Sequence, residues 1–232
     1  MNLESDKPFS TILLKISGEA FSDKEKAISQ EGLDYILGEI IPVYEMGVRI
    51  GVVVGGGNII RGAKSFTSLD REGMDYAGMM ATNINGLLLY HSLLHRGVDV
   101  SVFSGLEVRD VIPQYRGEHF RGIAVFCGGT GRPFFTTDTA AVLRALQIKA
   151  DILVKATKVD GVYSEDPEKN PEAEFFPELS YKEAIDKGLK IMDLTAFSLA
   201  MEHKLPISVI NFFKAGSLRR FVSGERIGSI IK

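Results

Sequence analysis

Cysteine is almost absent from this chain, which has Cys127 and no other among its 232 residues. A lone cysteine excludes an internal disulfide and is typical of a reducing compartment. Long apolar runs are also missing, since no stretch approaches the roughly 20 residues that a membrane-spanning helix needs. The first ten residues, MNLESDKPFS, lack the basic start and apolar core of a secretory signal. We therefore expect a cytoplasmic protein with no membrane partner.

An excess of charge of one sign is missing as well. The 27 Lys and Arg residues against 30 Asp and Glu residues give a formal net charge of -3, which excludes a general basic coat and argues against a nucleic-acid partner. No low-complexity segment, charge block or tandem repeat marks a linker. The length suffices for one sizeable α/β core.

What the chain does contain is a regular alternation of strand and helix patterns. Such alternation predicts a mainly parallel sheet with helices on both faces, with ligands beyond the carboxyl ends of the strands. We also expect a helical stretch after Gly57 and a capping box at Ser180–Glu183. The segment Lys158–Phe176 should contain little regular structure. Strands are expected at Thr11–Ser17, Val48–Val54, Val98–Phe103, Gly122–Phe126, Asp151–Ala156, Ile207–Asn211 and Gly228–Ile231, and helices at Gln30–Met46, Asp75–Arg96, Asp138–Ile148, Leu194–His203 and Ser217–Val222.

The most informative stretch is Ile50–Gly62, IGVVVGGGNIIRG, where an apolar strand pattern breaks into three glycines. Without Cβ atoms, a ligand can approach the backbone closely, and the N-terminus of a following helix favours an anion. The dinucleotide fingerprint fails here at Ile60, and the P-loop pattern fails at Ala63. We expect an anion-binding turn, with a turn needed for packing alone as the alternative.

Two lysines interrupt apolar strands at their ends, Lys15 in ILLKIS and Lys155 in DILVKAT. Burying an unpaired ammonium is costly, so each lysine is expected to have an anionic partner. A phosphate is favoured because both lysines end strands beside glycine turns, and the alternatives are pairing with a core carboxylate or extension to the sheet edge. Gly128–Asp138, GGTGRPFFTTD, is a second glycine-rich segment, and it carries hydroxyl groups. Either Thr137 or Asp138 is expected to cap the next helix, and Asp138 could instead hold both lysines. Asp75 could likewise cap the long helix or accept hydrogen bonds from a sugar.

No serine, cysteine or histidine lies in a recognisable nucleophile setting, and no zinc motif is present. Glycine turns, strand-end lysines and an arginine without a nucleophile suit phosphoryl transfer, where a protein mainly positions groups and stabilises charge.

Seven blocks of the chain closely resemble the bacterial uridylate (UMP) kinases of the amino acid kinase family. In order they read LLKISGEA, GVVVGGGNIIRGA, MDYAGMMAT, GTGRPFFTTDTAA, KATKVDGVYSEDP, MDLTAFSLA and HKLPI, and they span nearly the whole chain. The resemblance implies a three-layer α/β/α sandwich around a mainly parallel sheet. It also implies reversible, ATP-dependent phosphorylation of UMP to UDP in pyrimidine nucleotide biosynthesis, by direct in-line transfer.

The resemblance further implies a role for each matching residue. The catalytic positions are Lys15, Arg61, Asp138 and Lys155, with Asp138 organising the two lysines. The ATP-binding positions are Lys15, Ile16, Ser17, Gly18, Gly57, Arg61, Thr157, Tyr163 and Asp166. The UMP-binding positions are Gly56, Asp75, Thr130, Gly131, Arg132, Pro133, Phe134, Phe135, Thr136 and Thr137. Residues 1–150 would form a UMP-binding lobe and residues 151–232 an ATP-binding lobe of one domain.

From the same resemblance we expect a homohexamer, inhibition by UTP at the acceptor site, and Mg²⁺ carried by ATP without a dedicated protein site. The loop Phe21–Ser29 lacks the glycine of GTP-activated members, which leaves the response to GTP open. Two alternatives stand beside this hypothesis. One is a sibling kinase that phosphorylates a carboxylate or carbamate, and the other is a nucleotide-binding protein without catalysis.

Overall fold

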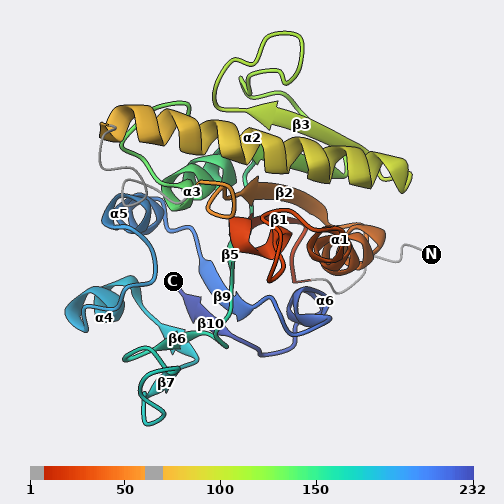
Figure 1. Ribbon diagram of the computed structural model, residues 1–232. Helices are drawn as coiled ribbons and strands as arrows, with labels where there is room; N and C mark the ends of the chain where they lie inside the picture. The colour runs from red at the N-terminus through yellow and green to blue at the C-terminus, as the bar shows by residue number, and fades with distance from the viewer. Residues whose placement is uncertain (1–7, 61–69) are drawn as a thin grey trace.

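The computed structural model describes residues 8–60 and 70–232 and contains one large twisted sheet between two layers of helices (Figure 1). The sheet has eight strands in the order β3-β4-β2-β1-β5-β9-β10-β8, and its only antiparallel pair among the described strands is β9 with β10. The expected three-layer sandwich around a mainly parallel sheet is confirmed. The strands are β1 (Thr11–Ile16), β2 (Arg49–Val54), β3 (Val100–Ser104), β4 (Ile123–Cys127), β5 (Ile152–Thr157), β8 (Glu178–Leu179), β9 (Ile207–Asn211) and β10 (Ser229–Ile231).

The helices divide between the two faces of the sheet. The core on one face includes side chains of α1, α2 and α6, and the core on the other includes side chains of α3, α4 and α5. Their bounds are α1 Gln30–Glu45, α2 Arg71–His95, α3 Thr137–Gln147, α4 Tyr181–Asp186, α5 Leu194–Glu202 and α6 Ser217–Val222, with a short 3-10 helix η1 at Gly18–Phe21.

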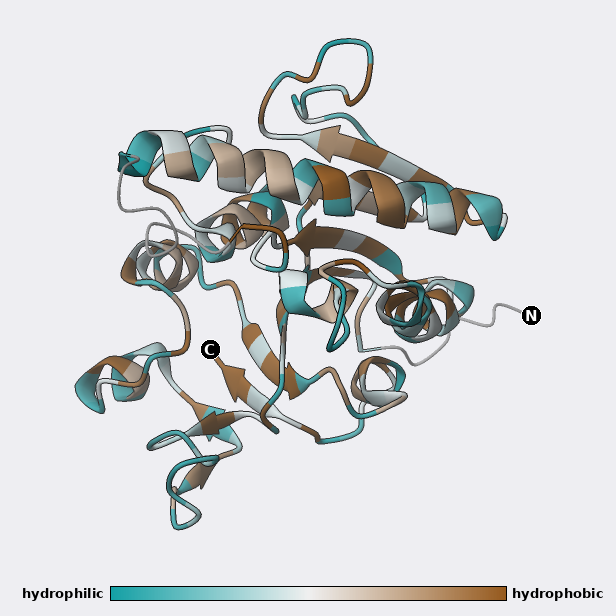
Figure 2. Cartoon of the chain, viewed as in Figure 1, coloured by the Kyte–Doolittle hydropathy of each residue, from teal (hydrophilic) through white to brown (hydrophobic). Residues whose placement is uncertain are grey.

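Strand periodicity decides which way each residue of the central strands points. In β1, Ile12, Leu14 and Ile16 pack into the α1/α2/α6 core, whereas Leu13 packs into the α3/α4/α5 core. Successive side chains of a strand alternate between faces, so Lys15 shares the face of Leu13. The strands are largely apolar because they are covered on both sides (Figure 2). The side chain of Lys15, near the end of β1, therefore points to the face of the sheet that α3 covers.

The element boundaries confirm most of the predicted pattern and correct two helix starts. The long helix begins at Arg71, with Asp70 as its N-cap accepting from Gly73 N, so Asp75 lies one turn inside and does not cap it. Helix α3 is capped by Thr136, so the expectation of Thr137 or Asp138 as the cap is wrong. The predicted capping box of Ser180 and Glu183 is present.

The excursion after β5 contains little regular structure, as expected. It holds only a two-stranded antiparallel pair, β6 (Val162–Tyr163) and β7 (Phe175–Phe176). Over the described ranges, no helix is long and apolar enough to cross a membrane.

Candidate active site

Two lysines and one aspartate form the centre of the site, and we call them the lysine–aspartate cluster. Lys15 of β1 and Lys155 of β5 are direct neighbours in the parallel register of the sheet. Both ammonium groups reach Asp138 of α3, with Nζ 2.8 Å from Oδ1 for Lys15 and 2.8 Å from Oδ2 for Lys155. The three side chains are between 12% and 17% exposed. The carboxylate thus bridges two buried cations.

The turn before α3 places Asp138 under the two lysines. Thr136 accepts hydrogen bonds from the backbone N of Asp138 (3.1 Å) and of Thr139 (3.3 Å), which fixes the first turn of the helix. A carboxylate in this first turn is also favoured by the helix dipole. Lys155 has a second partner, because its Nζ donates to the Ile191 carbonyl at 2.5 Å. Among the described residues, the Lys15 ammonium has Asp138 as its one polar partner.

Burial and charge act in opposite directions on this cluster. Burial raises the pKa of Asp138, but the two lysines outweigh it and hold that pKa below its ordinary value of 3.8. Burial lowers the pKa of Lys155, with Asp138 opposing this shift and Lys15 adding to it. The carboxylate is therefore ionised at neutral pH and unsuited to act as a base.

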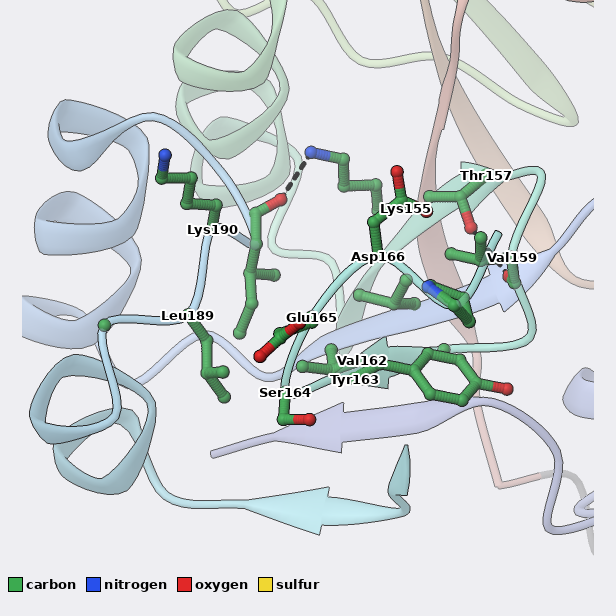
Figure 3. A pocket seen from close by; sticks show the side chains of 15 residues that line it. Lys155, Thr157, Val159, Val162, Tyr163, Ser164, Glu165, Asp166, Leu189 and Lys190 are labelled. Carbon is green, nitrogen blue, oxygen red and sulfur yellow. Dashed lines mark hydrogen bonds between the residues drawn. The ribbon is translucent and has the colours of Figure 1, made fainter. Parts of the chain in front are cut away.

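A cavity of about 500 Å³ lies on the Lys155 side of the cluster, and we call it the C-terminal cavity (Figure 3). Its wall combines apolar and polar groups from β5, β6 and the segment before α5. Three predicted nucleotide-binding residues, Thr157, Tyr163 and Asp166, lie in this wall. Its remaining lining residues include Val162, Glu165, Leu189, Lys190, Ile191 and Val209.

A second cavity of about 410 Å³, which we call the N-terminal cavity, lies on the Lys15 side. Glycine backbone and the first half of α2 line it. The predicted residues brought together here are Lys15, Ser17, Gly18, Gly56, Gly57, Asp75, Phe135, Thr136 and Thr137. The cluster thus stands between two cavities, with one lysine lining each.

The three glycines after β2 differ in whether a side chain would fit in their place. A Cβ on Gly55 would lie 2.8 Å from the Gly18 nitrogen, and one on Gly56 would lie 2.9 Å from the Ala81 Cβ, so close packing accounts for both. A Cβ on Gly57 would meet nothing within 4 Å. Through Ile60 the chain forms a turn, where a helix was expected. Arg61, predicted to act on the phosphates, lies outside the described residues.

The first part of the segment 130–137 does not line either cavity. Thr130 Oγ1 instead pairs locally with Arg132 N, at 3.2 Å, and Phe134 is 59% exposed with a φ of 71°. The Phe134 backbone N donates to Asp75 Oδ2 at 2.7 Å, so the predicted ribose ligand holds this segment. Gly131 and Pro133 belong to the same turn.

The predicted ATP-binding residue Ile16 is fully buried in β1. It could therefore offer a ligand only its backbone.

Sequence reasoning missed a group of buried or half-buried polar residues that hold the segments around the cavities. On α2, Thr82 accepts from Gly128 N at 2.7 Å and Asn85 donates to the Gly55 carbonyl at 2.7 Å. Asp193 accepts from Thr136 and from Thr139 and caps α5 through Ala196 N at 3.0 Å. The polar residues within the apolar pattern of α2 were the available signal, since a buried amide requires partners.

No group of three or more His, Cys, Asp or Glu residues within residues 8–60 and 70–232 could hold a metal ion. Both oxygens of Asp138 face lysines.

Comparison with known proteins places this geometry in a family. The model of the amino acid kinase family matches residues 10–211. The chain belongs to the amino acid kinase family. A uridylate kinase of Methylococcus capsulatus is 46% identical over 231 residues, covering 96% of this chain and 97% of that protein.

Two solved structures are similar to this chain over nearly its whole length. The crystal structure of a UMP kinase from Bacillus anthracis has a TM-score of 0.92 and 32% identity, covering 97% of this chain and 96% of that one. The crystal structure of a UMP kinase from Ureaplasma parvum has a TM-score of 0.89 and 31% identity, with coverages of 96% and 98%.

Proposed function

We propose that this member of the amino acid kinase family is an ATP-dependent UMP kinase that forms UDP reversibly in pyrimidine nucleotide biosynthesis. The observation that carries the proposal is the lysine–aspartate cluster between two cavities. Full-length relatives named uridylate kinase support UMP as the acceptor. Two nucleotides entering from opposite sides would present their phosphates to the same two ammonium groups.

The linings of the cavities support one assignment of the two substrates. Tyr163 and the aliphatic groups of the C-terminal cavity offer a surface for the adenine of ATP. The N-terminal cavity has Asp75 for the ribose of UMP. The lining residues run from 15 to 137 in one cavity and from 155 to 209 in the other, which favours the two proposed lobes. The expected ATP-binding residues Lys15, Ser17, Gly18 and Gly57 line the N-terminal cavity, so in this assignment they would contact ATP only at its phosphates.

The backbone of the turn Gly56–Asn58 offers a place for the phosphates. A Cβ on Gly18 would lie 2.7 Å from the Gly57 nitrogen and 2.9 Å from the Asn58 nitrogen, so Gly18 packs directly against this turn and no larger residue fits there. Among the described residues, nothing accepts a hydrogen bond from Gly56, Gly57 or Asn58 N. Consecutive free N–H groups form an anion-binding concavity.

The chemistry that we propose needs no general base. The phosphate of UMP carries a charge of about -1.5 to -2 at neutral pH, so its oxygen is already a nucleophile. That oxygen forms a bond to the γ-phosphorus of ATP in line with the breaking bond to the β–γ bridging oxygen, and ADP leaves. Lys15 and Lys155 would neutralise charge on the moving phosphoryl group. Mg²⁺ entering with ATP would supply further neutralisation.

Three further parts of the proposal concern the whole protein. We propose a homohexamer, competition of UTP with UMP for the N-terminal cavity, and a location in the cytoplasm. The single, buried Cys127 suits a reducing compartment. Sedimentation would test the assembly, and UTP inhibition kinetics at varied UMP would test the competition.

An acceptor panel tests the proposed reaction directly. In an assay of ADP release with ATP and Mg²⁺, UMP should be phosphorylated far faster than CMP, dCMP or acidic amino acids. Preference for an acidic amino acid would favour the sibling kinase. Binding of both nucleotides without formation of UDP would favour the non-catalytic protein.

Replacing Asp75 with alanine should raise the KM for UMP more than the KM for ATP. The change removes a carboxylate from the N-terminal cavity and releases the Phe134 backbone, while leaving the C-terminal cavity intact. We expect a rise of about tenfold or more for UMP, the usual scale for losing a hydrogen bond to a charged group. Steady-state kinetics with each nucleotide varied in turn would measure it, and an ATP-selective defect would contradict the assignment.

A further inference from the structure

One turn of α2 carries three buried polar side chains that hold segments around the N-terminal cavity. Thr82, Asn83 and Asn85 are 3%, 2% and 0% exposed. Thr82 accepts from Gly128 N in the second glycine segment, Asn83 accepts from Ser104 Oγ at 3.0 Å, and Asn85 holds the first glycine turn. A buried amide is costly unless its polar atoms are paired, so such residues specify one arrangement of their neighbours.

Asn85 forms a reciprocal amide pair with Asn58. Asn85 Nδ2 donates to Asn58 Oδ1 at 2.8 Å, and Asn58 Nδ2 donates back to Asn85 Oδ1 at 3.2 Å. Asn85 Nδ2 also donates to the Gly55 carbonyl, and Asn58 Nδ2 to the Ala27 carbonyl, each at 2.7 Å. The pair therefore holds the glycine turn at both ends and joins it to the loop before α1. We call the Asn58–Asn85 pair the clasp.

This clasp acts on backbone that lines the N-terminal cavity together with Lys15. Asn85 binds the turn at Gly55 and again at Asn58, so the N–H groups of Gly56, Gly57 and Asn58 belong to the segment that it holds at both ends. The short turn has only two main-chain hydrogen bonds of its own, from Ile59 N and Ile60 N to the Gly56 carbonyl, among the described residues. Side-chain amides thus supply much of what fixes its shape.

We propose that Asn58 and Asn85 are positioning residues for phosphoryl transfer, holding the Gly56–Asn58 backbone N–H groups in place for a substrate phosphate. The inference rests on the proposed kinase function. It adds to the proposed catalytic residues two asparagines that contact the glycine turn and not the reacting atoms. Loss of the clasp would leave Lys15, Asp138 and Lys155 in place but would loosen the backbone donors of the glycine turn, which lines the same cavity as Lys15. Misplacement by about 1 Å is enough to cost a large factor in rate.

The test replaces Asn85 with serine, which removes both of its amide donations. A matched control is Leu89→Ala, one turn further along α2, which removes fully buried apolar contact and no polar contact. Asn58→Ala is a milder variant that keeps the Asn85 bond to Gly55. We expect Asn85→Ser to lower kcat by about tenfold or more at saturating UMP and ATP, and Leu89→Ala to keep kcat per folded molecule within about twofold. Asn58→Ala should fall between them.

Amide hydrogen exchange of the 55–60 backbone, measured without nucleotide, separates this inference from the proposed function. Exchange should accelerate in Asn85→Ser and not in Leu89→Ala. Unchanged exchange, or faster exchange with kcat within about twofold of wild type, would overturn the positioning role. If the wild-type protein formed no UDP, the kinase proposal and the positioning role would both fall. In that case faster exchange in Asn85→Ser would still establish the clasp itself.

Discussion

Replacing Lys15 with alanine is expected to lower kcat at least about a hundredfold while leaving the fold intact. Lys15 lines the N-terminal cavity and, within the part of the chain that the structure describes, has Asp138 as its one polar partner. Two of its donors therefore remain available for a phosphate. Losing an electrostatic donor to a transition state costs roughly 3 kcal/mol, which is about a hundredfold in rate. Asp138 keeps Lys155, so no buried carboxylate is left unpaired.

Single-turnover rates of Lys15→Ala and of Lys15→Met, which keeps most of the side-chain volume, would separate charge from packing. Both variants should be equally slow, and thermal unfolding should show little change in stability. Near-normal turnover in either variant would overturn the assigned role of Lys15. Recovery in Lys15→Met alone would show that the volume of the side chain matters and its charge does not.

Replacing Asp138 with asparagine should reduce both turnover and stability. The change leaves the ammonium groups of Lys15 and Lys155 side by side without their shared counter-charge. Removing one partner of a buried ion pair typically costs about 3–5 kcal/mol of unfolding free energy. Urea unfolding at neutral pH measures the loss, and kcat should fall at least as far as in Lys15→Ala. A variant as stable and active as wild type would refute the bridging role.

The pH dependence of stability offers a second readout on Asp138. Its pKa in the folded protein lies below the ordinary 3.8, so between the two values the unfolded chain binds more protons. Unfolding free energy therefore rises with pH across this interval. The contribution is complete above 3.8 and is lost as pH falls through the folded pKa. The stability gap between wild type and Asp138→Asn should accordingly be narrower in acid than at neutral pH.

The location of the cluster could be predicted because it depends on features that are local in sequence. Lys15 and Lys155 each end an apolar strand pattern, and parallel strands bring their carboxyl ends to one edge. Asp138 lies at the start of an amphipathic helix, just after a glycine segment. These patterns located the three residues, and the register of β1 with β5 made the two lysines neighbours.

The details that sequence could not supply depend on contacts between distant segments. Thr136 caps α3 although Thr137 and Asp138 have the same capping chemistry, because only the backbone path selects one of them. Asp75 was expected at a helix start, but the helix begins four residues earlier, at Arg71. The carboxylate of Asp75 instead accepts a hydrogen bond from the Phe134 backbone. Asn85 was not singled out at all, because its partners are 27 and 30 residues away in the sequence.

The pairing of β1 with β5 has a mechanical consequence. Lys15 and Lys155 stand on adjacent strands in matched register, so their spacing is set by the main-chain ladder, about 4.8 Å per strand. Loops and helices can move when nucleotides arrive, but a ladder buried on both faces keeps the two lysine Cα atoms at a fixed spacing, and Asp138 holds both ammonium groups. Any closure of the enzyme must then carry the substrates to a pair of charges that is already assembled.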